Sequence, residues 1–326
     1  MRLRLQGKKI CVTGGAGFIG SHTAKTLKKE GAEVYVLDNR YTEAGTKYTD
    51  WFCKHDYSDE DTLSFLRQKG IDGFVHCAGS SLVGPSMKDP GLYYDNNVGK
   101  TVKFLEHLST WDNKPFVVFS SSAATYGIPK TVPIKESDHK TPISPYGQSK
   151  LMIEKILRDF DKAHGIKHFC YRYFNACGAD TYDHELGPEP GDTHIIPKIF
   201  EAYQNGDAFN MFGTDYNTPD GTCVRDYIHV TDLALAHALA CDQLLNGSDS
   251  KIYNLGTNQG YSNQNLIDSF KKQVGDIKVN NAERRIGDPD ELIADASLIK
   301  QELDWEAQYS DIDTIIKDTK LFYENN

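Results

Sequence analysis

The 326-residue sequence lacks a long run of lysine and arginine, a CxxC pair and a long apolar stretch. It carries 46 acidic against 36 basic residues, and its formal net charge of −10 argues against a nucleic acid as partner. A small phosphorylated ligand stays possible, since local amides and a few arginines can face it. No segment approaches the roughly 18 apolar residues that a membrane span needs, so we expect no membrane association.

The seven cysteines are odd in number and scattered, and several lie in apolar runs. This arrangement favours buried free thiols over disulfides or a zinc site. The apolar run at residues 10–13 ends at once in glycines and is too short for the hydrophobic region of a signal peptide. We therefore expect a reduced, cytoplasmic protein with no metal site.

Short β-branched runs alternate with longer amphipathic stretches in the first half of the chain. Strands are predicted at residues 9–13, 33–37, 73–77, 116–120 and 168–173, and helices at 19–30, 97–108 and 145–164. Such alternation is typical of βαβ units. Right-handed crossovers make them a doubly wound parallel (Rossmann) sheet, so we predict the α/β fold class.

The composition changes after residue 175. Residues 176–221 are rich in Gly, Pro, Asp and Tyr and show little regular period. A strand-like run at 225–230 leads into a helix at 231–245, which we expect Thr231 and Asp232 to cap. Short helices follow from residue 261. We predict a NAD-binding domain of residues 1–175 plus about 222–260, and a smaller mixed α/β nucleotide-sugar lobe of about 176–221 plus 261–326.

A glycine-rich turn at residues 13–20, TGGAGFIG, contains both the G-x-G-x-x-G and the G-x-x-G-x-x-G spacing. It follows a predicted strand and opens a helix, the context in which the backbone can approach a pyrophosphate. Asp38 ends the next strand, where its carboxylate can accept hydrogen bonds from a ribose diol and repel a 2′-phosphate. NAD is favoured over NADP, although Arg40 nearby opposes that preference. Cofactor contacts are predicted at Gly14, Gly17, Phe18, Ile19, Gly20, Asp38 and Asn39.

Asp56 and Tyr57 follow another short apolar stretch. They could contact the adenine of the cofactor, or they could form a polar loop without such a role. His76 ends a strand at the same sheet edge, and we interpret it as a structural histidine without a part in the chemistry.

Residues 120–122, all serine, end a predicted strand at the edge where open α/β sheets bind ligands. Tyr146 and Lys150 lie four residues apart at the start of a helix and therefore project from one face. A free tyrosine has a pKa of ~10, and a neighbouring ammonium with a cationic nicotinamide ring favours its phenolate. The Ser122 hydroxyl can hydrogen-bond the same substrate oxygen. The combination predicts a nicotinamide-dependent enzyme.

These motifs stand beside others that span nearly the whole chain. They include VTGGAGFIGSHT (12–23), SSSAATYG (120–127), SPYGQSK (144–150), RYFNACGA (172–179), FGTDYNTPDGTCVRDYIHVTDLALAH (212–237) and RRIGDPDELIADAS (284–297). Together they resemble the extended short-chain dehydrogenase/reductase superfamily, and within it the UDP-glucose (UDP-galactose) 4-epimerases. Residues 220–229 and 284–288 are the stretches most characteristic of the epimerases.

The resemblance implies NAD-dependent 4-epimerisation of a UDP-hexose through a transient 4-keto sugar. It implies that Tyr146 is the acid/base on the sugar 4-hydroxyl, that Lys150 tunes it and holds the nicotinamide ribose, and that Ser122 assists. Asn97 and Tyr173 would also contact the cofactor. The implied substrate contacts are Asn175, Phe212, Arg225, Arg285, Asp288 and Leu292, with Phe212 stacked on the uracil.

Three alternatives follow from the same residues. Nucleotide-sugar 4,6-dehydratases of this superfamily carry Asp-Glu after the strand-end serine, where this chain has Ala123 and Ala124, so dehydration is disfavoured. Leu292, intermediate in size beside the sugar 2-substituent, leaves UDP-N-acetylhexosamine and UDP-pentose open as substrates. A non-catalytic NAD-sensing protein would be expected to lose the Tyr146–Lys150 pair.

The superfamily also implies a homodimer, for which the helices at 97–108 and 145–164 are candidates.

Overall fold

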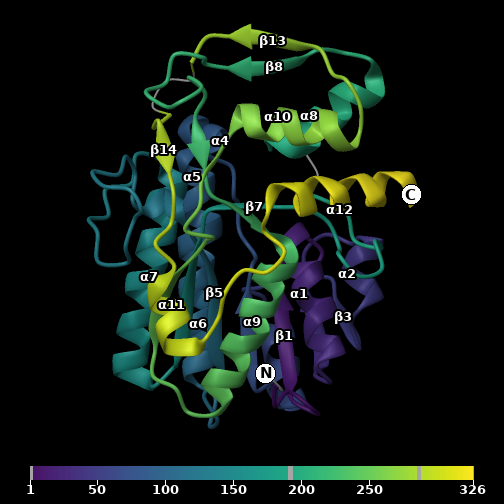
Figure 1. Cartoon of the computed structure of the whole chain (residues 1–326). Helices are drawn as coiled ribbons and strands as arrows, with labels where there is room; N and C mark the ends of the chain where they lie inside the picture. Colours follow the sequence, from purple (N-terminus) through teal and green to yellow (C-terminus); the bar gives the residue numbers. More distant parts are fainter. Residues whose placement is uncertain (1–2, 190–193, 285–287, 326) are drawn as a thin grey trace. The chain divides into compact units, whose positions relative to one another are not determined.

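The computed structural model describes residues 3–189, 194–284 and 288–325, which form two compact units (Figure 1). The first unit comprises Met1–Gly127, Lys140–Arg172 and Leu233–Tyr253, and the second comprises Ile128–His139, Tyr173–Asp232 and Asn254–Asn326. Residues 128–139, 173–175, 222–232 and 254–260, expected in the cofactor domain, are grouped with the second unit. The assignment of a cofactor domain and a substrate lobe stays a prediction.

A seven-stranded sheet in the order β11-β6-β5-β4-β1-β2-β3 forms the centre of the first unit. Its strands are β1 (Lys9–Thr13), β2 (Glu33–Leu37), β3 (Trp51–Cys53), β4 (Gly73–His76), β5 (Phe116–Ser122), β6 (His168–Tyr173) and β11 (Lys251–Leu255). Neighbouring strands from β3 to β5 pair in parallel. The predicted parallel, doubly wound α/β fold is confirmed, while β3 and β11 were not predicted.

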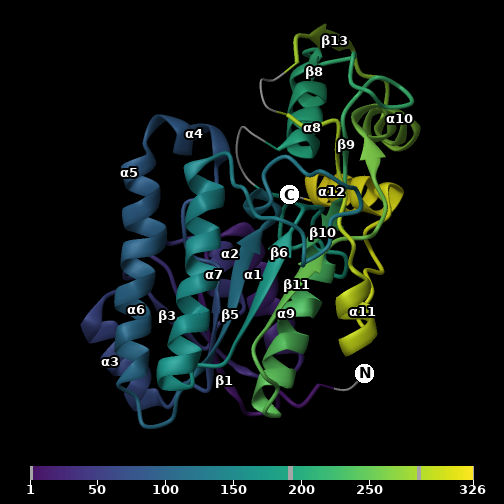
Figure 2. The same cartoon turned by 90° about the vertical axis from the view of Figure 1, so that its left-hand side faces the viewer.

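Helices cover both faces of this sheet. They are α1 (Phe18–Lys29), α2 (Glu43–Lys47), α3 (Glu60–Lys69), α4 (Val83–Lys88), α5 (Pro90–Tyr93), α6 (Lys100–Ser109), α7 (Pro145–His164) and α9 (Val230–Leu245). Val117, Phe119 and Cys170 join a core cluster with α3, α6 and α7. Tyr171 points the other way, and its hydroxyl donates to the carbonyl of Ala236 in α9. Because successive side chains of a strand point to opposite faces, the sheet packs against helices on both faces. Figure 2 shows α7 and α9 on opposite sides of β5 and β6.

The helix that positions the Tyr-Lys pair lies at the predicted residues. The Ser144 hydroxyl accepts a hydrogen bond from the Gly147 amide, Pro145 occupies the first turn, and Gly165 ends α7 at φ +75°. The helix predicted at 97–108 differs, because the chain first forms a π-helical turn, η1 (Tyr94–Gly99), and then α6. One π-helical turn is too short to leave a period of its own in the sequence, so the side-chain pattern predicted a plain α-helix.

The second unit combines short sheets with helices. Its elements are β7 (Asn175–Cys177), α8 (Ile195–Asn205), β8 (Phe209–Phe212), β9 (Val224–Arg225), β10 (Tyr227–His229), β12 (Tyr261–Ser262), α10 (Asn263–Gln273), β13 (Val279–Ala282), β14 (Glu291–Leu292), α11 (Ser297–Leu303) and α12 (Ile312–Asn325). Residues from α8, β8, α10 and α12 share one apolar core. Figure 1 shows the parallel pair β8–β13 beside α8 and α10.

Two features of this unit differ from the local sequence pattern. Residues 176–221 show little regular period, yet they contain α8, whose Ile196, Ile199 and Phe200 are buried. Asp232 was expected to cap its own helix, but its carboxylate accepts hydrogen bonds from the Gln308 and Tyr309 amides. The Asp232 carboxylate, which the local sequence pattern assigned to the helix N-terminus, therefore accepts hydrogen bonds from a loop that is distant in sequence. Across the described ranges, no helix combines the length and the apolar character needed to cross a membrane.

Candidate active site

The glycine turn at the end of β1 packs closely against neighbouring backbone. Gly14 has a φ of +73°, and a Cβ there would lie 2.6 Å from the Ala78 amide nitrogen. A Cβ on Gly20 would collide with the Gly14 carbonyl oxygen. Gly17 precedes α1 and makes no side-chain cap, so the first-turn amides, including those of Phe18 and Ile19, receive no hydrogen bond from a capping side chain. The glycines therefore permit a tight turn, and the first-turn amides of α1 suit an anion.

Asp38 lies directly after β2 and is buried. Its carboxylate accepts hydrogen bonds from the Ala16 amide (3.0 Å) and from the Arg40 amide (2.9 Å). It thereby fixes the glycine turn, and remaining lone pairs are available to a ribose. Asn39 follows on the exposed side. The Arg40 guanidinium lies 3.8 Å from the position that a Cβ on Gly17 would take.

The residues proposed near the adenine have separate places. The Asp56 carboxylate accepts a hydrogen bond from the Lys100 ammonium at 2.6 Å. The Tyr57 ring is 5% exposed and belongs to the core between His76 and Phe104. The structure therefore gives Tyr57 a packing role and leaves little of its side chain for a ligand. His76 is buried against two threonine hydroxyls, and burial lowers its pKa to about 3.

Ser122, Tyr146 and Lys150 lie at the carboxyl end of β5. A Cβ on Gly147 would collide with the Ala124 carbonyl, so the glycine lets α7 approach the turn after Ser122 closely. The Ser122 hydroxyl accepts a hydrogen bond from the Ala124 amide at 3.1 Å. Both Ser122 and Tyr146 are half-buried, which leaves each accessible to a ligand.

Lys150 is 5% exposed and sits behind Tyr146. Its ammonium donates to the Ser120 carbonyl (2.8 Å) and lies 4.8 Å from the Phe119 ring centroid and 5.9 Å from the Tyr146 ring centroid. Burial lowers the pKa of Lys150 to about 8. The predicted pairing of a tyrosine with a nearby ammonium is thus present, and the charge is easily lost above neutral pH.

Asn97 ties the neighbouring loop to α7. Its amide donates to the Ser80 carbonyl and to the Ser149 hydroxyl, each at 3.0 Å, and its oxygen accepts from the Ser80 amide at 2.7 Å. These bonds occupy both amide hydrogens, so a cofactor contact would use the remaining lone pair. Tyr173, the last residue of β6, is buried.

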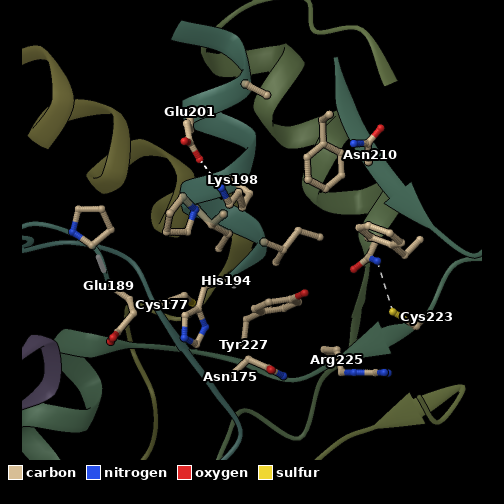
Figure 3. A pocket seen from close by; sticks show the side chains of 18 of the residues that line it. Asn175, Cys177, Glu189, His194, Lys198, Glu201, Asn210, Cys223, Arg225 and Tyr227 are labelled. Carbon is tan, nitrogen blue, oxygen red and sulfur yellow. Dashed lines mark hydrogen bonds and ion pairs between the residues drawn. The ribbon is translucent and has the colours of Figure 1, made fainter. Parts of the chain in front are cut away.

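A cavity of about 610 Å³ opens in the second unit (Figure 3). Four residues implied as substrate contacts line it: Asn175, Phe212, Arg225 and Asp288. The Arg225 guanidinium donates to the Asp288 carboxylate at 3.1 Å and to the Val224 carbonyl at 2.8 Å. Leu292 pairs with Arg225 in the β14–β9 ladder but is not among the described residues that line the cavity. Arg285 lies outside the described residues.

Sequence analysis missed one wall of this cavity. Helix α8 contributes His194, just before its first turn, together with Lys198 and Glu201, which form an ion pair at 2.6 Å (Figure 3). Tyr227 from β10 also lines the cavity. The apolar spacing of Ile196, Ile199 and Phe200 was a usable signal for this helix, obscured by Pro197 and by the surrounding glycines and prolines.

The seven cysteines are free, and five of them are buried with raised thiol pKa values: Cys11, Cys170, Cys177, Cys223 and Cys241. Within the part of the chain that the structure describes, no group of His, Cys, Asp and Glu residues is arranged to hold a metal ion.

Comparison with known families gives a match over residues 10–256 to the NAD dependent epimerase/dehydratase family. This chain belongs to that family. The match begins at β1 and continues beyond the glycine turn and the Tyr-Lys pair to the end of β11, so the family covers all the strands of the central sheet.

Individual members of the NAD dependent epimerase/dehydratase family resemble this chain along nearly its full length. A UDP-glucose 4-epimerase from Lactobacillus helveticus is 45% identical over 315 residues, which cover 94% of each chain. The crystal structure of a UDP-glucose 4-epimerase from Brucella ovis in complex with NAD is 42% identical, with a TM-score of 0.92 over 97% of this chain and 98% of that one. The UDP-Glc/GlcNAc 4-epimerase of Campylobacter jejuni is 38% identical, with a TM-score of 0.83 over 98% of this chain and all of its own.

Proposed function

We propose that this protein is an NAD-dependent epimerase that interconverts UDP-glucose and UDP-galactose. The observation that carries the proposal is the cluster of Ser122, Tyr146 and Lys150 at the ligand edge of the parallel sheet that bears the glycine turn. Relatives of similar length named UDP-glucose 4-epimerases support it.

The glycine turn fits NAD. A Cβ at Gly14 or Gly20 would overlap the backbone of Ala78 or of Gly14, so only glycine permits this tight turn, and the α1 amides suit a pyrophosphate. Asp38 would accept hydrogen bonds from the adenosine ribose, and its charge would disfavour a 2′-phosphate. NAD, when bound, would supply the temporary acceptor for the hydride from sugar carbon 4.

The chain itself would handle the proton. Tyr146 would remove it from the sugar 4-hydroxyl, because the Lys150 ammonium close to its ring favours the phenolate. Ser122 would hydrogen-bond the same oxygen. Tyr146 would return the proton to the 4-oxygen as the hydride goes back to the opposite face of carbon 4 in the transient 4-keto sugar, which would invert carbon 4 without net oxidation.

The UDP moiety would be held by the cavity of the second unit. Arg225, oriented by Asp288, is a planar donor suited to a diphosphate, and Phe212 offers a ring to the uracil. Asn175 lies on the wall of the same cavity, and Arg285 is also implied as a contact. Anchoring at the nucleotide lets the sugar turn over between the two transfers while the complex stays together.

The test is direct. Purified protein should show absorbance from bound NAD(H) and should convert UDP-galactose to UDP-glucose in a coupled assay. An NAD-binding protein that interconverts none of UDP-glucose, UDP-N-acetylglucosamine and UDP-xylose would be a sensor and not an epimerase.

Sugar preference would depend on Leu292. We propose the hexose because the relatives are named for UDP-glucose, although the Campylobacter jejuni relative is named for both UDP-Glc and UDP-GlcNAc. Exchange of Leu292 for tyrosine should lower activity on UDP-N-acetylglucosamine relative to UDP-glucose, and exchange for cysteine should raise it. An unchanged ratio in both variants would exclude this residue as the determinant.

We further propose a cytoplasmic homodimer formed through α6 and α7. Met152, Ile156 and Phe160 on α7 are only partly buried within the chain, which leaves apolar surface for a second copy. Light scattering of the purified protein and fractionation of the source cells would test these two points separately.

A further inference from the structure

A buried ion pair lies beneath the proposed catalytic cluster. The Glu154 carboxylate receives two parallel hydrogen bonds from Arg172, Nε to Oε1 at 2.9 Å and Nη2 to Oε2 at 2.6 Å, and both side chains are 3% exposed. Burying two charges is costly, and well-packed apolar residues often replace such a pair without loss of stability. The pair therefore calls for a reason other than stability.

The pair connects three elements at one point. Glu154 lies on α7 one turn beyond Lys150, and Arg172 lies on β6, the neighbour of β5. The Ser121 hydroxyl of β5 donates to Glu154 at 2.6 Å. The adjacent residue, Ser120, accepts from Lys150 at 2.8 Å. Two consecutive residues of β5 are thus bonded to two successive turns of α7, which prevents the helix from sliding or rotating against the strand.

The pair also holds the segment that follows the cluster. Arg172 donates through Nη1 to the Tyr126 hydroxyl at 2.8 Å, and its guanidinium lies 4.9 Å from the Tyr126 ring centroid. Ser122 therefore stands between two residues, Ser121 and Tyr126, that both bond to the same ion pair. Every group in this network is less than one-tenth exposed.

We propose that Glu154 and Arg172 are positioning residues for the epimerisation, because they fix α7 against β5 and thereby set Tyr146 and Lys150 opposite Ser122. This inference rests on the proposed function for its chemistry. Neither residue needs to touch a ligand. A displacement of about 1 Å at reacting groups can lower a rate by about 100-fold, so a loosened register has a measurable consequence.

The main test is the double variant Glu154→Met with Arg172→Met, which removes both charges and keeps the packed volume. We expect a folded protein that still binds NAD, with kcat lowered about 10- to 100-fold and KM for the UDP-sugar within about twofold. Arg172→Lys, which keeps the charge but loses the planar fork, should show a smaller loss of kcat. Leu66→Ala, a core truncation in α3, serves as the control that lowers Tm without touching the network.

A crystal structure of the double variant gives a readout that is independent of activity. The Lys150 Nζ to Ser120 O distance, 2.8 Å in the native chain, should lengthen, and Tyr146 should move relative to Ser122. An unchanged geometry, a kcat within twofold of the native enzyme, or an equal loss in Leu66→Ala would each overturn the proposal. Should the native protein epimerise no UDP-sugar, the proposed function fails, and the crystal geometry still decides the positioning role.

Discussion

The reacting edge of the first unit and the cavity of the second unit hold their side chains differently. Lys150 is 5% exposed and bonded to the main chain, whereas Phe212 is 37% exposed at the cavity wall. The first set depends on one strand and one helix, while the cavity collects residues from β7, α8, β8 and β9. A reacting group requires a fixed position, and a binding surface must admit and release its ligand.

This comparison suggests that substitutions in the two regions should have separable effects. Changes at the edge of the first unit should lower kcat, and changes in the cavity should weaken nucleotide binding. The following predictions test that separation. A substitution at the reacting edge that changed nucleotide binding, or a substitution in the cavity that changed kcat alone, would argue against it.

The largest effect is expected for Tyr146→Phe, which removes the acid/base hydroxyl but keeps the ring. We predict that kcat falls about 1,000-fold, within the range of general acid–base catalysis, while the Kd for UDP measured by calorimetry stays unchanged. Tyr94→Phe, at an exposed tyrosine of the same unit, is the control and should keep full activity. Full activity of Tyr146→Phe would remove the tyrosine from the mechanism.

Arg225→Ala should give the next largest effect, in binding. Loss of charge-assisted hydrogen bonds to the diphosphate should raise the Kd for UDP about 30- to 100-fold, with NAD affinity unchanged. Lys272→Ala, which breaks an exposed ion pair with Asp313 in the same unit, should leave Kd within twofold. If Arg225→Ala lowered kcat alone, the assignment of the cavity to UDP would be wrong.

Activity should also fall above neutral pH because of Lys150. Burial lowers its pKa to about 8, so the ammonium is present below pH 8 and lost above it. We expect kcat/KM to fall about tenfold between pH 7.5 and pH 9, since about a tenth of the ammonium remains at pH 9. The affinity for UDP, measured over the same pH range, should not show this fall.

Lys150→Arg tests whether Lys150 causes this alkaline fall in kcat/KM. A guanidinium stays charged throughout this range, so the alkaline fall should move to higher pH even if overall activity drops. An alkaline fall that stays near pH 8 in this variant would point to another group.

The lowered pKa of Lys150 also has a consequence for stability. Between pH 8 and about 10.5 the unfolded chain binds this proton and the folded chain does not, so this group makes the fold more stable as pH rises.

The smallest effect is predicted for Phe212→Ala. The ring is partly exposed, so the loss of stacking should raise the Kd for UDP about fivefold, near the lower limit for an aromatic ring on a base. Phe212→Tyr keeps the ring and should bind UDP like the native chain. Equal weakening in both variants would argue that the position acts through packing of β8 and not through a base.

Most of the first unit could be predicted from the sequence because its signals are local. The glycine turn, Asp38 and the Tyr146–Lys150 spacing each lie within or directly after one element, and the strands and helices that hold them were found within a few residues. Tyr57 shows the limit of this reasoning. Its place after a short apolar stretch suggested a contact with the adenine of the cofactor, yet its ring belongs to a core with β4 and α6, which are distant in sequence.

The sequence by itself determined the α/β class, the glycine turn and the pairing of Tyr146 with Lys150, because these depend on spacing along the chain. Only the tertiary structure decided that Asn175, Phe212, Arg225 and Asp288 share one cavity and that α8 forms its wall. It also joined Glu154 to Arg172, residues on a helix and a strand. A buried charge reveals its partner only after folding, since burial and distance are properties of the packed chain and not of its local pattern.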